Sequence, residues 1–238
     1  MQSMHLMKSP YLFLNSFLFS LLILGTAYSC KKETIIPDSP SYNYFPTEKG
    51  KWVEYDVDSI YHGENDNNND DSVYTFHFQI REEIDSTFTN SQGQATQILS
   101  RYKRASSSDS WVITAVWTQN LSLTGAYRTE DNVPYHKLAF PISSSISWDG
   151  NDANTLDEEL YSYDTFHQAT NVGGQSFDST LTVIQVDENN FIERIYGVEM
   201  YAVGVGMIFK QRDNLGKRNG IVVKGLEYTM TLRDYGPR

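Results

Sequence analysis

Cysteine is almost absent from this chain of 238 residues, which contains one, Cys30. A single cysteine excludes an internal disulfide framework and a zinc site made of several thiolates. Catalytic motifs are missing too, because neither G-x-S-x-G nor H-E-x-x-H occurs in the sequence. We therefore expect a chain that is not an enzyme and that holds no cofactor and no metal.

Positive charge is also scarce. Lys and Arg total 19 against 30 Asp and Glu, so the formal net charge is -11, and it becomes -12 when Lys8 is removed with the leader. Such an acidic chain is not expected to bind nucleic acid or to adhere electrostatically to anionic lipid. Any attachment to a membrane must therefore come from covalently bound acyl chains.

Long hydrophobic runs are confined to one stretch, residues 11–27. It is uncharged, follows the basic Lys8 and precedes Cys30, as in a secretory signal that ends in a lipobox. In a bacterial lipoprotein the cysteine at the cleavage point accepts a diacylglycerol thioether, and the new N-terminus is then acylated. We therefore predict a signal peptide over residues 1–29 and a lipid anchor on Cys30.

Two other interpretations of this stretch remain open. A transmembrane helix would need about 20 apolar residues, whereas this run is shorter and contains Asn15 and Ser20. A plain secretory signal that leaves Cys30 free is favoured by Ala27 and Tyr28, which depart from the usual lipobox residues. Lipidation is preferred because an odd cysteine is a liability in an oxidising compartment unless it is used.

Residues 30–44 are polar and contain Pro37 and Pro40, so they are predicted to form a lipidated tether rather than a helix or central strand. Residues 45–238 are predicted to form one β-domain, since all-β domains often have this length. After Cys30, the acidic run that sends some lipoproteins to the cell surface is incomplete. We therefore expect an outer-membrane lipoprotein of a Gram-negative bacterium that faces the periplasm.

Alternation with a period of two predicts strands along most of the domain. It is clearest from Val73, where Tyr74, Phe76, Phe78 and Ile80 fall on one face, which is predicted to be buried. Residues 66–70 begin like a calcium loop but lack its glycine and closing glutamate, so a solvated hairpin loop is preferred. Helical periodicity is weak outside the leader, although residues 190–201 could make a short helix.

The late stretch YAVGVGMIFKQ places Gly204 and Gly206 two residues apart inside a β-like run, and hence on one face. Such a pair predicts a bulge, a bend or a close backbone approach. It is not a dinucleotide fingerprint, because no helix follows.

Together these patterns predict an all-β fold, a single strongly curved antiparallel sheet (half-barrel or barrel-like) of about nine to eleven strands in meander order. A closed barrel and a sandwich remain open as alternatives.

Three stretches, YFPTEKGKWVEYDVDSI, WVITAVW and YAVGVGMIFKQ, resemble those of a group of uncharacterised Gram-negative lipoproteins. The late glycine motif is also similar to that of LolA-like periplasmic β-proteins. The second resemblance implies a curved sheet around a hydrophobic cavity, and neither resemblance implies catalytic residues.

We therefore expect a noncatalytic envelope lipoprotein that binds an apolar ligand or an envelope partner on its curved sheet. An accessory or structural subunit of an outer-membrane or surface assembly is the alternative, and an envelope hydrolase is less favoured.

Overall fold

The computed structural model describes residues 41–63 and 72–237. They form one antiparallel sheet of twelve strands and a short 3-10 helix, η1 (Tyr42–Tyr44). The predicted all-β class and single sheet are confirmed, with one strand more than the predicted range. The strands are β1 (Trp52–His62), β2 (Val73–Thr89), β3 (Ala95–Arg104), β4 (Val112–Leu121), β5 (Gly125–Glu130), β6 (Val133–Ala139), β7 (Ser147–Asp149), β8 (Leu160–Val172), β9 (Gln175–Asn189), β10 (Glu193–Ala202), β11 (Gly206–Arg218) and β12 (Ile221–Gly236).

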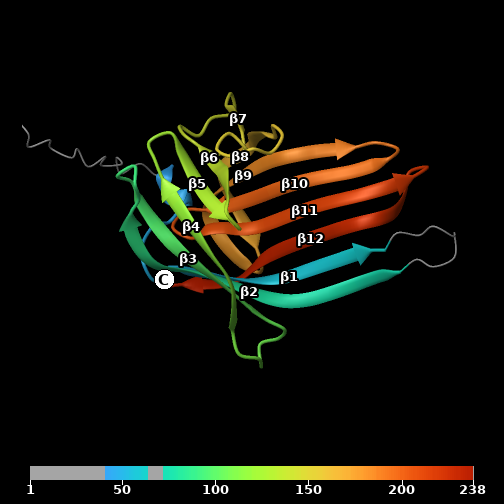
Figure 1. Cartoon of the computed structure of the whole chain (residues 1–238), viewed down its shortest axis with the longest axis horizontal. Coiled ribbons are helices and arrows are strands. Elements are labelled where there is room, and N and C mark those ends of the chain that lie inside the picture. Colours follow the sequence, from blue (N-terminus) through green and yellow to red (C-terminus); the bar gives the residue numbers. More distant parts are fainter. Residues whose placement is uncertain (1–40, 64–71, 238) are drawn as a thin grey trace, which may run out of the picture. The chain divides into compact units, whose positions relative to one another are not determined.

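The strand order is that of a meander that starts and ends in the middle of the sheet. Strands β1 and β12 are neighbours, and the two halves run outward from them to β6 on one side and β7 on the other (Figure 1). Every other pair joins strands that are consecutive in the sequence, and turns of two to seven residues connect most of these pairs. The predicted meander order is confirmed.

The sheet curls until its two edges meet, but no strand ladder joins β6 to β7. The amide of His136 donates to the carbonyl of Gly150 at 2.9 Å, and the Trp148 indole donates to the His136 carbonyl at 2.9 Å. The Tyr163 hydroxyl donates to the Ala139 carbonyl at 2.7 Å and accepts from its amide at 3.0 Å. Side chains therefore hold most of this seam, and the fold is barrel-like without a continuous ladder.

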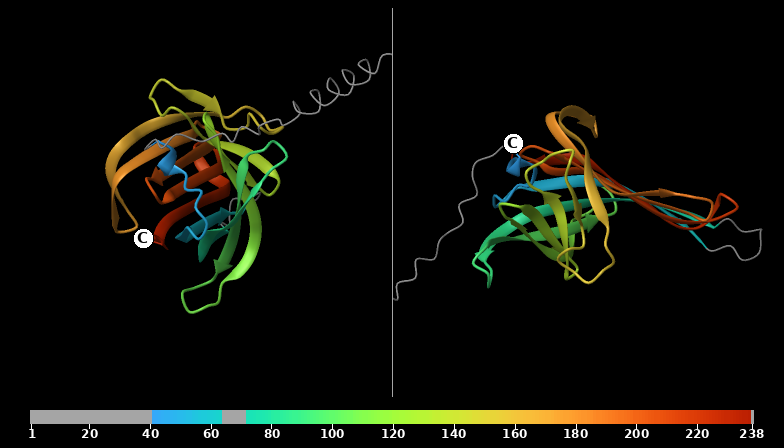
Figure 2. Two further views of the ribbon diagram at one scale, coloured as in Figure 1. Left: turned by 90° about the vertical axis from the view of Figure 1, so that its left-hand side faces the viewer. Right: turned by 90° about the horizontal axis from the view of Figure 1, so that it is seen from above.

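Curling places one face of every long strand in the core. On β1, Val53, Tyr55 and Val57 are buried while the residues between them point outward. The segment before β1 fills part of the interior, where Tyr44 and Phe45 are buried (Figure 2). Tyr44, at the predicted end of the tether, thus belongs to the core, and its hydroxyl bonds the Ser179 Oγ at 2.7 Å.

Six strands continue past the curled part as a single layer, seen edge-on in Figure 2. We call this layer the open sheet and define it by residues 59–62, 73–76, 186–189, 193–197, 212–218 and 221–228, which lie side by side by register. Its inward-pointing residues continue the row that is buried in the curled part.

The prediction for β2 is right about the shared face and wrong about burial at one end. Ile80 is 4% exposed, whereas Tyr74 and Phe76 are each 53% exposed. They lie on the open sheet, where residues 41–63 and 72–237 form no second layer over the face. The alternation is a property of the strand itself, but burial depends on what lies opposite.

Two further predictions assigned residues to the wrong type of element. Gly204 lies in the tight turn between β10 and β11, and Gly206 is the first residue of β11, with φ of 76° and 97°. The expected close approach is real, because a Cβ on Gly206 would lie 3.2 Å from the Pro46 Cδ. The short helix suggested for residues 190–201 is instead β10 and the turn before it.

Candidate functional site

The predicted lipidation residue, Cys30, lies outside the described residues, as does the calcium-like loop at 66–70. The described residues contain no group of three or more His, Cys, Asp or Glu side chains able to hold a metal ion. In the same part of the chain, no helix is long and apolar enough to cross a membrane.

The inner face of the curled part carries buried charges that the sequence patterns did not reveal. Glu82 on β2 is 4% exposed and pairs with Arg101 on β3 and Arg128 on β5. Arg128 also donates to the Gln119 Oε1 at 3.1 Å. The position of Glu82 between Ile80 and Ile84 was the available signal, since a charge on an apolar face needs a buried partner.

A second ionic cluster surrounds Glu199 on β10, which is fully buried. Its carboxylate accepts from the Lys137 Nζ at 2.6 Å, lies 3.2 Å from the Lys210 Nζ and accepts from the Tyr201 hydroxyl at 2.6 Å. Burial alone would raise the pKa of Glu199, but Lys137 and Lys210 outweigh it and hold the pKa well below its usual range. Glu130 joins the cluster at 3.6 Å from the Lys137 Nζ.

These contacts make the two clusters structural. Glu82, Glu130 and Glu199 each have a cationic partner, and the ionised form of Glu199 is strongly favoured. A general acid or base needs a pKa near the working pH and reach to a substrate. Neither condition is met by a permanently ionised, fully buried carboxylate such as Glu199.

The open sheet has a different inner face. Register places Tyr61 opposite Tyr74 on one side and Leu226 on the other. Phe76 lies next to Tyr74 on the same face, and the Tyr61 and Tyr74 rings are 6.4 Å apart. Tyr61, Tyr74, Phe76 and Leu226 are between 41% and 53% exposed. They form a contiguous apolar row that faces solvent.

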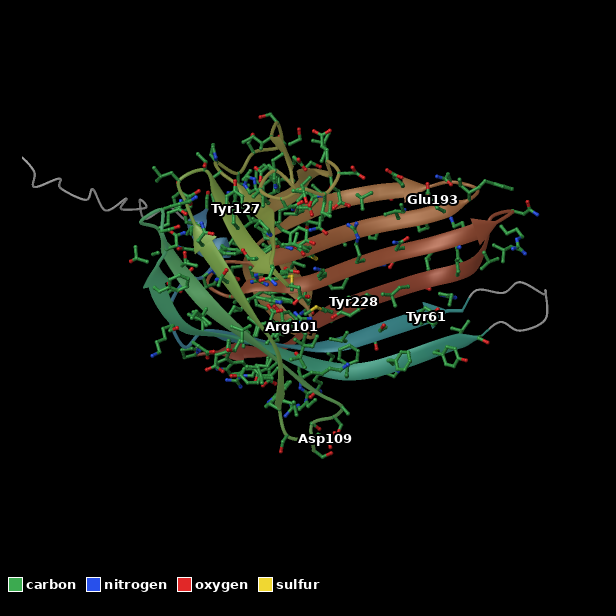
Figure 3. The ribbon with its side chains drawn as sticks, in the orientation of Figure 1. Tyr61, Arg101, Asp109, Tyr127, Glu193 and Tyr228 are labelled. Carbon is green, nitrogen blue, oxygen red and sulfur yellow. The ribbon has the colours of Figure 1, made fainter. Side chains whose placement is uncertain are left out.

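Tyr228 and Arg101 mark the boundary between the two regions. The Arg101 guanidinium lies near the Tyr228 hydroxyl, at 3.4 Å, and stacks over the Trp117 ring at 4.5 Å (Figure 3). Arg101 therefore points into the core.

On its other face the open sheet carries one buried carboxylate, Asp213, which is 7% exposed. Its Oδ2 accepts from the Gln211 amide at 2.9 Å, and its Oδ1 has no hydrogen-bond partner among the described residues. Burial raises its pKa, the Gln211 hydrogen bond lowers it, and Glu227 on the neighbouring strand raises it further. The net shift is upward, opposite to that of Glu199.

Comparison with known proteins does not assign the chain to a family. No family model matches the chain, and no curated protein matches it. The crystal structure of a candidate lipoprotein from Parabacteroides distasonis ATCC 8503 resembles it at 9% identity and a TM-score of 0.40, covering 81% of this chain and 98% of that one. At this level the likeness carries no argument about function.

Proposed function

We propose that this chain is a noncatalytic lipoprotein of a Gram-negative envelope, anchored through Cys30, that docks an envelope partner on its open sheet. The observation that carries the proposal is the contiguous apolar row of Tyr61, Tyr74, Phe76 and Leu226, over which the described residues place no second layer. Single exposed hydrophobic residues are common, but a contiguous patch indicates a surface that another molecule covers.

The interior gives less support to the other binding mode, an apolar ligand inside the curved sheet. The space beside Phe45, Tyr55 and Met207 has a volume of only about 30 Å³. Pockets for small molecules measure about 300 to 1,000 Å³, so this space is too small for such a ligand. Because Tyr44 and Phe45 occupy the interior here, binding on the open sheet is the favoured form of the proposal. A permanent partner would make the chain an accessory subunit.

The docking proposal is tested by site-specific photo-cross-linking in the cell envelope of the host. A photoreactive residue replaces Tyr61 on the open sheet, which is 48% exposed, or Leu123 in the turn between β4 and β5, which is 46% exposed. We expect a discrete protein adduct from position 61 and none from position 123. Equal labelling at both positions, or no adduct from position 61, would reject the proposal.

The anchor is tested separately. Three acyl chains exceed the two signals needed for stable attachment, so the mature protein should partition into the detergent phase. Cys30→Ser should abolish that partitioning. If Cys30→Ser were processed and anchored as before, the lipoprotein assignment would be wrong.

A further inference from the structure

One edge of the open sheet lacks a neighbouring strand. Residues 73–78 of β2 pair with β1 on one side, while pairing with β3 on the other side begins at Gln79, opposite Arg104. Among the described residues, no strand pairs with the free side of 73–78. In an antiparallel ladder alternate residues point their N–H and C=O groups to each side, so about three residues present them at this edge.

The opposite edge of the open sheet is protected, and this one is not. Residues 186–189 of β9 also pair on one side only, but they include Asp187 and Glu188. Residues 73–78 contain no Asp, Glu, Lys, Arg or Pro. Exposed strand edges normally carry charge or proline because an uncharged edge is a template for another strand. The free edge of β2 therefore fits an added strand.

β4 offers a second uncharged edge at residues 112–117, where it pairs with β3 alone. What distinguishes β2 is a groove of about 910 Å³ between its free edge and the β3–β4 hairpin. That hairpin leaves the sheet, with Asp109 at its tip (Figure 3). The groove is lined on one side by Thr75, Phe76, His77 and Phe78, and on the other by Lys103 and Val112 among others.

Lys103 supplies a positive charge to the lining of the groove. Its Nζ lies 3.7 Å from the centre of the Phe78 ring, and it has no carboxylate partner among the described residues. Arg104 differs, since it donates to the Gln79 Oε1 at 2.7 Å and stacks on Trp111. Lys103 is thus an exposed cation placed where an added strand would begin, and a carboxylate is the group that complements it.

We propose that the free edge of β2 binds an extended peptide segment as an added antiparallel strand, with apolar side chains on Tyr74 and Phe76 and a carboxylate on Lys103. This mode uses main-chain hydrogen bonds for affinity and alternate side chains for selectivity. The proposal rests on the proposed function and names the chemistry of the partner. A second copy of this chain fits less well, because its own residues 73–78 bring no carboxylate to Lys103.

The test uses the protein without its leader and the probe peptide Ac-Glu-Thr-Val-Thr-Val-Thr-NH2. In the antiparallel direction, its glutamate lies opposite Phe78 and its valines lie opposite Phe76 and Tyr74. We expect NMR titration to shift the amide signals of residues 73–78. The reversed peptide, and one with alternate backbone nitrogens methylated, should bind more weakly, because the first misplaces the carboxylate and the second removes main-chain donors.

Variants locate the site. Lys103→Glu should weaken probe binding about five- to tenfold, because an exposed ion pair is replaced by repulsion. Lys49→Glu makes the same charge change at an exposed lysine before β1 and should leave binding unchanged. Phe76→Lys should weaken binding about tenfold by removing apolar contact. Val116→Lys, at a comparably exposed residue on the β4 edge, should have no effect.

The outcomes separate this inference from the proposed function. Probe binding that ignores Lys103→Glu, or that is lost with Val116→Lys, overturns the strand-addition site, and so does a dimer in the absence of peptide that Phe76→Lys dissociates. Adducts from position 61 in cells without probe binding would leave docking standing and reject strand addition. Probe binding without such adducts would reject the docking function instead.

Discussion

Six strands run through both the curled part and the open sheet, yet the same alternating pattern leads to burial in one region and exposure in the other. On β2 one row of alternate residues runs from Tyr74 to Ile80, and it is exposed at the first and buried at the last. On β12 the row passes from Leu226, 41% exposed, to Met230, 1% exposed. A period of two therefore identifies a face, and the tertiary structure decides whether that face is a core or a surface.

Charges show the same contrast between the two regions. In the curled part Glu199 is ionised between Lys137 and Lys210, and its pKa lies below its usual range. On the open sheet Asp213 has no cationic partner within hydrogen-bonding distance, and its pKa is raised. A buried charge stabilises a fold only when a partner compensates for its desolvation.

The largest effect is expected from breaking the ionic cluster around Glu199 in the curled part. Lys137→Met removes one partner from the buried Glu199 and should lower the free energy of unfolding by about 3 to 5 kcal/mol. Urea denaturation followed by circular dichroism measures it. Lys103→Met, at an exposed lysine, should change stability by less than about 0.5 kcal/mol. Similar losses from both variants would contradict the distinction between a buried, ion-paired lysine and an exposed one.

The second comparison lies along β2. Ile80→Ala should destabilise by about 2 to 5 kcal/mol, because it leaves a cavity in the core. Phe76→Ala should cost much less, since half of that side chain is already in water. The same denaturant titration tests the pair. An equally large loss from Phe76→Ala would mean that the open sheet is covered in solution.

A third effect concerns the turn between β10 and β11, which packs against Pro46 in the segment before β1. Gly206→Val should cost about 1 to 3 kcal/mol, because its Cβ meets Pro46 and φ is positive. Gly204→Val introduces similar backbone strain without a neighbour within 4 Å, so its cost should be smaller. Melting temperatures of the two variants measure the difference. A larger loss at Gly204 would show that packing on Pro46 is unimportant.

The last effect depends on pH and has opposite signs in the two regions. The lowered pKa of Glu199 contributes stability above about pH 4.5 that is lost as the pH falls, so Glu199→Gln should destabilise at pH 7 and less below pH 4.5. The raised pKa of Asp213 makes its ionised form unfavourable, so Asp213→Asn should stabilise at pH 7, with the gain fading near pH 4. Melting curves between pH 3 and 8 test both. A loss of stability from Asp213→Asn at pH 7 would contradict the upward shift.

Much of the fold could be predicted from the sequence because strands and turns are local features. The sequence pattern of residues 221–235 predicts a strand, and β12 spans Ile221–Gly236. The pattern also predicts strands at 121–128 and 133–140, of which the first overlaps β5 and the second matches β6. The tight turn at residues 203–205 was mistaken for part of a strand, because alternating Val and Gly occur in strands and in turns, and φ distinguishes the two.

The candidate site was largely hidden. Tyr74 and Phe76 were recognised as one face, but their exposure depends on where the sheet stops curling, which no local pattern encodes. Glu82 and Glu199 form ion pairs with Arg128 and Lys137, which lie 46 and 62 residues away in the sequence. Cys30 was predicted from its leader alone and stays a prediction.

The sequence by itself determined which residues share a strand face, because the period of two is a property of the extended backbone. It also determined where many hairpins turn. Only the tertiary structure decided that β1 pairs with β12, that the curl closes on Tyr163 and Ala139, and that one half of the same strands is left as a single layer. The physical reason is that burial and charge pairing depend on neighbours brought together from distant parts of the chain.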